Sequence, residues 1–434
     1  MTAHAPTVLD YLDTDFAPFS DDAPFNPLDA CVFAELAMVR AEGFASCPCH
    51  LRDLMHAERY PEMFSGFIAA DLRRAFLAAA ASPRFRDLEV LDVTGVTDEG
   101  AQTQFAALAM SCPGRFTVVS YRGTDGTITG WREDCNMAFT WPVPGQAQAQ
   151  SYLERMAERT RGPLYVCGHS KGGNLALYAA VKVPAEVRSR IAAVYDLDGP
   201  GFRPQAFSDE EYARVRDRLV KVIPRDSVVG LVLETRGDWR VVPSSNVAVM
   251  QHDAFSWQAD LARRDFAYLD EPSQGALYFK GVVDEWLAGY SDDELRLFVN
   301  TLFDSLRHMA GSDSMAQVFG EGKNPFAVLS DAARKADGDG KALAMRMVGQ
   351  LTGIATKAAG RTMADSVGDF LQDTVQGLTD RLPLQAAQRD DAHQQRGDAS
   401  HRKDDARQLP DADSERDAEE SVQNAAPTPR RPLP

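Results

Sequence analysis

The chain has 434 residues, of which 44% are hydrophobic and 25% are charged, so it can bury one large core with room for a smaller subdomain. Its formal net charge of −17 argues against a nucleic acid as the main partner, because a polyanion would be repelled. The sequence contains no apolar run of membrane-spanning length and no basic, then apolar, signal peptide at its start, so we expect a cytoplasmic protein.

The first third of the chain predicts an arm followed by helices. Residues 1–30 are rich in Asp, Phe and Pro, and their aromatic residues are spaced too irregularly for a regular element, so we expect an extended arm packed on the core. Apolar residues at helical spacing then predict one helix from Asn26 to near Gly43 and another over roughly Pro61 to Ala81.

The stretch Cys47-Pro48-Cys49-His50 offers three soft metal ligands within four residues. A structural zinc site usually needs four ligands, and the sequence shows no second pair at a recognisable spacing. The six cysteines are irregularly placed, which is typical of reduced thiols rather than of a disulfide framework. We expect neither a metal nor a cofactor.

Beyond these helices the hydrophobic pattern changes to that of a sheet. Glu89 to Thr94, Gln102 to Met110 and Arg115 to Tyr121 are short, rich in β-branched and aromatic residues, and separated by turn residues. They predict three strands, the last two joined as a hairpin. A helix is expected from about Ala147 to Arg161.

The segment from Leu164 to Ala180 reads as a strand, a tight turn and a helix. Its turn, Gly168-x-Ser170-x-Gly172, is typical of a nucleophile elbow, in which a serine stands on a strained turn with its hydroxyl at the top of a sheet. The following helix N-terminus would favour an oxyanion. The alternative is an ordinary glycine-rich turn with an exposed serine.

Downstream, strands and helices alternate. Arg190 to Asp198 predicts a strand, Asp209 to Arg218 a helix, and Leu219 to Ile223 another strand. Alternation at these lengths indicates an α/β fold with a mostly parallel central sheet and helices on both faces.

A nucleophilic serine needs an imidazole to take its proton. His252 fits this role, since it follows a predicted hairpin of Trp239 to Val242 with Asn246 to Met250. His169 is too close in sequence to Ser170 to serve as its base.

The imidazole in turn needs a carboxylate on its other nitrogen. Asp226 is our first candidate, because it directly follows the strand Leu219 to Ile223. Asp198 is the second candidate, and Asp196 and Asp253 remain rivals.

Two backbone N–H groups aimed at one point could hold the oxyanion of a tetrahedral intermediate. One would come from Lys171, the residue after the serine, and the other from Thr124, in the Gly- and Thr-rich loop after the strand that ends at Tyr121. The alternative for this loop is a polar surface hairpin.

Several motifs occur together in this chain: Tyr121-Arg122-Gly123-Thr124-Asp125, Trp131 with Asp134, Gly168 to Ala176, Asp226, and Gln251-His252-Asp253-x-Phe255-x-Trp257. On these motifs the chain resembles the class 3 lipase branch of the α/β-hydrolases, and more narrowly the Mbeg1-like (DUF2974) family, over roughly residues 7–310. The resemblance implies an α/β-hydrolase fold and a serine hydrolase with Ser170 as nucleophile, His252 as base, Asp226 as acid, and Thr124 and Lys171 at the oxyanion hole.

Lys171 departs from the Leu that lipases of this branch usually carry in their GHSLGG motif. Its cation would suit an anionic or polar substrate; alternatively, the side chain reaches solvent and only the backbone is used.

The remaining chain is predicted to be helical and then disordered. Amphipathic helices are expected over Ser273 to Leu287, Ser291 to Met309, Asn324 to Ala336 and Lys341 to Leu371, either as a cap, as a packing or oligomerisation surface, or as ordinary core helices. We divide the chain into the arm (1–30), a catalytic core (31–260), a helical region (261–382) and a polar tail (383–434).

The sequence thus predicts a serine hydrolase of the lipase or esterase type that acts through an acyl-enzyme on a small or lipid-like ester. Two alternatives remain: a non-catalytic binding module with the same fold, and an amidase, peptidase or thioesterase with the same residues. Contact with a membrane surface and the oligomeric state are left open.

Overall fold

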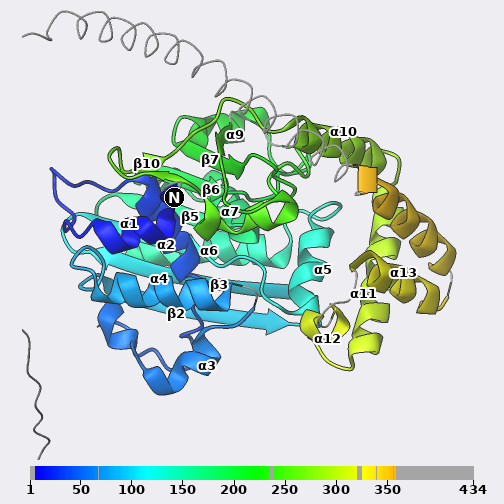
Figure 1. Cartoon of the computed structure of the whole chain (residues 1–434), viewed down its shortest axis with the longest axis horizontal. Coiled ribbons are helices and arrows are strands. Elements are labelled where there is room, and N and C mark those ends of the chain that lie inside the picture. The colour runs from blue at the N-terminus through cyan, green and yellow to red at the C-terminus, as the bar shows by residue number, and fades with distance from the viewer. Residues whose placement is uncertain are drawn as a thin grey trace, which may run out of the picture. The chain divides into compact units, whose positions relative to one another are not determined.

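The computed structural model describes residues 5–357, except 67, 235, 237, 238, 320–324, 339 and 355. Its centre is an eight-stranded sheet whose strands lie side by side in sequence order (Figure 1). The strands are β1 (Cys49–His50), β2 (Glu89–Asp98), β3 (Thr103–Cys112), β4 (Phe116–Tyr121), β5 (Leu164–His169), β6 (Ile191–Leu197), β7 (Leu219–Pro224) and β8 (Trp239–Val242).

Strand direction changes at β4. Strands β1 to β4 are antiparallel neighbours, whereas β4 to β8 run parallel, in the mostly parallel arrangement that the sequence predicts. The predicted hairpin of the second and third strands is confirmed as β3 and β4, and β2 joins them with a second hairpin. Parallel strands place all their carboxyl ends at one edge, where loops can gather functional side chains.

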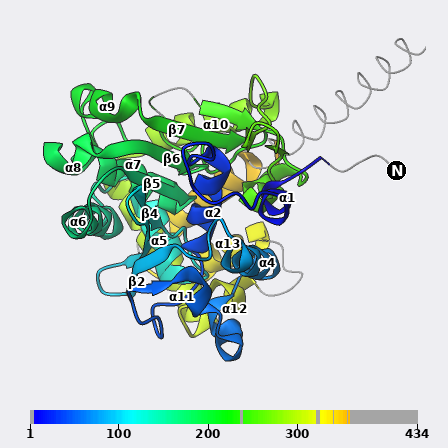
Figure 2. The same ribbon diagram turned by 90° about the vertical axis from the view of Figure 1, so that its left-hand side faces the viewer.

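Helices cover both faces of the sheet. Alternate residues of β3 show how the two cores form: Leu108 and Met110 face α1 (Val8–Thr14), α2 (Pro27–Leu36) and α4 (Ala69–Ala81), whereas Ala107 and Ala109 face the opposite core. That second core contains α6 (Pro144–Arg159), α7 (Lys171–Lys182) and α9 (Asp209–Arg216). Figure 2 shows α2 and α4 separated from α6 by the sheet.

The N-terminal arm is partly helical, which the sequence analysis missed. Thr7 begins α1 through a capping box, since Asp10 accepts a hydrogen bond of 2.8 Å from the Thr7 N–H. Val8, Tyr11 and Leu12 are buried. This local cap, and not the spacing of the aromatic residues, determines the helix.

Three further expectations differ from the structure. The first predicted helix ends at Leu36, well before Gly43, and the second divides into α3 (Tyr60–Met63) and α4. Trp239–Val242 is a strand, but it pairs in parallel with β7, and Ala248–His252 forms a 3-10 helix in place of the predicted second hairpin strand.

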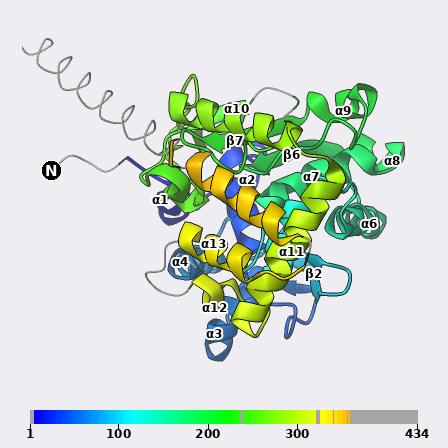
Figure 3. The same ribbon diagram turned by 90° about the vertical axis from the view of Figure 1, so that its right-hand side faces the viewer.

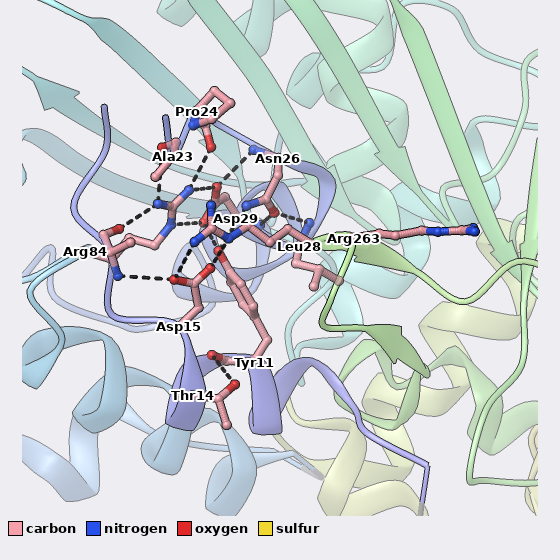
Figure 4. A network of polar contacts seen from close by, with 12 residues as sticks. Tyr11, Thr14, Asp15, Ala23, Pro24, Asn26, Leu28, Asp29, Arg84 and Arg263 are labelled. Atoms are coloured by element: carbon pink, nitrogen blue, oxygen red, sulfur yellow. Dashed lines mark hydrogen bonds and ion pairs between the residues drawn. The ribbon is translucent and has the colours of Figure 1, made fainter. Parts of the chain in front are cut away.

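A buried polar cluster fastens the N-terminal helices to the core (Figure 4). Arg84, just after α4, donates hydrogen bonds to both carboxylate oxygens of Asp29 at 2.8 and 2.6 Å, and both side chains are fully buried. Tyr11 donates its hydroxyl to Asp29 at 2.7 Å, and Asn26 donates to the Tyr11 oxygen. The cluster therefore links α1, α2 and the end of α4.

The C-terminal helix α11 (Asp292–Ala310) packs beside α5 (Ile128–Asn136), as Figure 1 shows. Figure 3 shows the C-terminal helices from their own side of the molecule. Arg132 of α5 pairs with Asp304 of α11 at 2.8 Å, and the Thr129 N–H donates to Asp313 at 2.9 Å. The other helices of this region are α10 (Gln274–Ala288), α12 (Met315–Phe319), α13 (Pro325–Lys335) and a helical stretch over 341–354. The predicted end of the helical region and the tail lie outside the described residues.

Candidate active site

Ser170 stands on a strained turn between β5 and α7. Its backbone φ of 59° is one that a residue with a side chain rarely adopts, and its N–H donates to the Leu197 carbonyl of β6 at 2.9 Å. Glycines permit the sharp turn, because a Cβ on Gly168 would collide with the Gly172 backbone. The local geometry is that of a nucleophile elbow with the α7 N-terminus directly behind it.

The structure pairs His252 with Asp198, our second candidate for the acid. His252 Nδ1 lies 2.6 Å from Asp198 Oδ2, and the Asp198 side chain is fully buried while that of His252 is 26% exposed. The other Asp198 oxygen accepts hydrogen bonds from the Ser227 hydroxyl and the Gly230 N–H, at 2.5 and 3.1 Å. Asp198 therefore holds one imidazole nitrogen and leaves Nε2 for another partner.

Asp226, our first candidate, lies elsewhere. Its carboxylate accepts a hydrogen bond of 2.7 Å from the Gln251 side chain, and its N–H donates back to the same amide at 2.9 Å. Asp226 thus fixes the residue before His252 rather than the imidazole itself. The turn after β7 directs Asp226 toward Gln251, whereas Asp198, with a φ of 50°, turns its carboxylate toward His252.

The two remaining candidates for the acid, Asp196 and Asp253, form contacts with other groups. Asp196 Oδ2 lies 2.7 Å from Lys221 Nζ, in a buried ion pair. Asp253 caps a short 3-10 helix by accepting a hydrogen bond of 3.1 Å from the Phe255 N–H.

His169 contacts both the backbone carbonyl and the imidazole ring of His252. Its Nε2 donates to the His252 carbonyl at 2.8 Å, its Nδ1 forms an ion pair of 2.9 Å with buried Glu35, and the two imidazole rings lie 4.6 Å apart. Burial disfavours the charged form of His169, but the Glu35 carboxylate outweighs this and raises the pKa of His169 to about 9. Sequence spacing excluded His169 as a base but gave no sign of this contact.

We expect the His169–Glu35 pair to make folding stability depend on pH. Because the folded-state pKa is raised above the ordinary value near 6.5, its contribution is complete below about pH 6.5 and is lost as pH rises through about 9. The free energy of unfolding should fall by about 3 kcal/mol over this range. Urea unfolding of wild type, Glu35→Gln and the exposed-histidine control His56→Gln would test this, with the slope reduced only in Glu35→Gln.

The loop after β4 packs directly against the elbow. A Cβ on Gly172 would collide with the Tyr121 carbonyl, and one on Gly123 would lie 2.9 Å from the His169 carbonyl and 3.3 Å from the Ser170 Cβ. The loop that carries Thr124 therefore lies beside Ser170. The Thr124 hydroxyl donates a short hydrogen bond to Asp134 of α5.

The sequence analysis considered two positions for the Lys171 side chain, facing a substrate or reaching solvent, and the structure shows neither. The side chain is fully buried, and its Nζ donates to the main-chain and side-chain oxygens of Gln104 at 2.8 and 2.6 Å. Nζ also lies 3.2 Å from the Glu133 carboxylate. The cation therefore neither faces a substrate nor reaches solvent.

Within the described residues, no group of three or more His, Cys, Asp or Glu side chains is arranged to hold a metal ion. His50, from the Cys47-Pro48-Cys49-His50 stretch, lies with its Nδ1 3.2 Å from the Asp87 carbonyl. No helix in the same part of the chain has the length and apolarity needed to cross a membrane.

The sheet, its two helical layers and the serine at the β5–α7 turn define an α/β-hydrolase fold. The chain belongs to the Mbeg1-like family, whose model matches residues 79–304. Comparison with curated proteins finds no match.

Several solved structures are similar over part of the chain. M37 lipase is 16% identical, with a TM-score of 0.34 over 46% of this chain and 68% of its own. The lipase from Rhizopus microsporus var. chinensis is 13% identical, with a TM-score of 0.33 over 53% of this chain and 75% of its own. A triacylglycerol lipase described as having a serine protease triad is 14% identical, with a TM-score of 0.31 over 52% and 82%.

Proposed function

We propose that this chain is a serine hydrolase that cleaves carboxylic esters through an acyl-enzyme on Ser170, with His252 as base and Asp198 as acid. The observation that carries the proposal is the 2.6 Å contact between His252 Nδ1 and a fully buried carboxylate, beside a serine held at a φ of 59°. Such strain and burial cost folding free energy and are typical of functional sites.

In the proposed chemistry each group has a defined role. Asp198 fixes the imidazole tautomer, so that His252 Nε2 can take the Ser170 proton as the oxygen attacks the ester carbonyl. The oxyanion that forms is held by the backbone N–H groups of Thr124 and Lys171, with the α7 N-terminus behind them. His252 then gives its proton to the leaving alcohol, and water, activated by the same imidazole, releases the acid.

Exposed apolar side chains beside the base favour an ester with an apolar acyl group. Val247, Val249 and Met250 lie two to five residues before His252 and are 75%, 57% and 56% exposed. An amide or thioester would use the same catalytic residues, so the scissile bond has to be established by assay.

The first experiment is labelling with a fluorophosphonate probe, read by intact mass. We expect wild type and the surface control Ser151→Ala to gain one adduct each, and Ser170→Ala to gain none, because only an activated serine displaces fluoride from phosphorus. Equal labelling of Ser170→Ala would move the nucleophile elsewhere. Absence of labelling in wild type would favour a non-catalytic binding module.

A substrate panel would then separate the bond types. Faster turnover of p-nitrophenyl esters than of matched anilides and thioesters is the expected result, with longer acyl chains preferred over acetate. A preference for the anilide would make the chain an amidase with the same site.

A further inference from the structure

Lys171 places a buried cation next to the proposed nucleophile. Its ammonium group is in contact with Gln104 of β3 and Glu133 of α5, as described above. Burying an ammonium group is costly unless its charge is paired and its hydrogen bonds are made. These contacts tie the first residue of α7 to two elements that flank the Thr124 loop.

The same network reaches that loop by two routes. Gln104 Oε1, which accepts from Lys171, also accepts a 3.4 Å hydrogen bond from the Asp125 N–H. Lys171 Nζ lies 4.0 Å from Asp134 Oδ1, and the other Asp134 oxygen accepts the Thr124 hydroxyl. The cation is therefore coupled to the residue that would supply the second oxyanion donor.

Asp134 is the member of this network whose protonation state depends on the nearby cation. Its Oδ1 is buried and accepts no hydrogen bond from the described residues. Burial raises the pKa of Asp134 to about 6, while Lys171 and the Thr124 hydroxyl lower it and the Glu133 and Asp125 carboxylates raise it. At pH 7 the carboxylate is ionised, but this pH lies only about one unit above its pKa, and removing the cation would shift it toward the protonated form.

Other charges around α5 are engaged elsewhere. On the side packed against α11, Arg132 pairs with Asp304, and Arg307 donates to Thr129. Asp125 lies 3.4 Å from Arg40. Lys171 is thus the cation whose charge bears directly on Asp134.

We propose that Lys171 is a positioning residue of the oxyanion hole. Its ammonium group keeps Asp134 ionised, so that Asp134 holds the Thr124 hydroxyl and with it the loop that presents the Thr124 N–H. The inference rests on the proposed serine hydrolase function and explains why a lysine can stand where an apolar residue would avoid the cost of burial.

The test is the pH dependence of ester hydrolysis by Lys171→Met. At pH 7 we expect kcat to fall by about 10- to 100-fold with KM nearly unchanged, because an oxyanion donor is misplaced. Activity should return toward wild type as pH is raised to 9, where Asp134 ionises again. In the double variant Lys171→Met/Asp134→Asn this recovery should disappear.

Lys182→Met is the matched control, since Lys182 ends the same helix and pairs with Glu211 at the surface. It should keep the wild-type rate and pH profile. If Lys171→Met does not fold, Lys171→Met/Glu133→Gln removes the unpaired carboxylate and allows the same measurement. A loss that is constant from pH 6 to 9, or no loss at all, would overturn the inference.

A second measurement does not require turnover. The Asp134 carboxyl carbon, assigned by its absence in Asp134→Asn, can be titrated by carbon NMR, and its midpoint should rise in Lys171→Met. An unchanged midpoint would refute the role of Lys171 even in an active enzyme. Conversely, a raised midpoint in Lys171→Met together with no turnover by wild type would mean that the hydrolase proposal fails while the Lys171–Asp134 coupling holds.

Discussion

Replacing Asp198 with Asn should lower kcat for ester hydrolysis by about 10³- to 10⁴-fold, whereas Asp226→Asn should cost less than about tenfold. Asparagine keeps the shape of the side chain but cannot accept the Nδ1 proton as an anion, so it favours the wrong imidazole tautomer and does not stabilise the imidazolium. The 2.6 Å contact between His252 Nδ1 and Asp198 Oδ2 is the one on which the proposed base would depend.

The two variants form a matched pair, because both aspartates are buried and each follows a parallel strand of the same sheet. Asp198 also accepts hydrogen bonds from Ser227 and Gly230, so urea unfolding should accompany the kinetics to show that Asp198→Asn remains folded at the assay temperature. A larger kinetic loss in Asp226→Asn than in Asp198→Asn would restore Asp226 as the acid.

The difference between these aspartates shows what the sequence can and cannot predict. Each comes within two residues of the end of a strand. Strand position alone does not reveal in which direction a side chain turns. One signal was available: Gly199-Pro200-Gly201 after Asp198 marks a sharp break in the chain, at which a φ of 50° arises. The strands themselves were predictable because burial on both faces leaves continuous apolar runs.

Contacts between distant segments were beyond sequence reasoning. Lys171 could be recognised as unusual beside Ser170, but its partners come from positions 67 and 38 residues away. His169 and Glu35 are likewise brought together only by packing α2 against β5. Such ion pairs depend on which faces of the helices and strands pack together. The order of residues in the sequence does not reveal this packing.

Replacing Arg84 with Met should destabilise the fold by about 3–5 kcal/mol, because it leaves the Asp29 carboxylate buried without its cation (Figure 4). The nearby Tyr11 hydroxyl can offer Asp29 one hydrogen bond but no charge. Arg74→Met is the control: Arg74, on α4, lies 2.6 Å from Asp13, the same distance as in the Arg84–Asp29 pair, but both of its side chains are about half exposed. An exposed pair of this kind contributes at most about 1 kcal/mol.

Urea unfolding of the two single variants and of Arg84→Met/Asp29→Leu would measure the cost of the unpaired charge separately from the value of the pair. Replacing both partners with apolar residues removes the desolvation penalty as well as the attraction, so the double variant should recover much of the loss. If Arg84→Met and Arg74→Met were equally mild, water would have to reach Asp29, and the cluster would not fasten the N-terminal helices as its burial indicates.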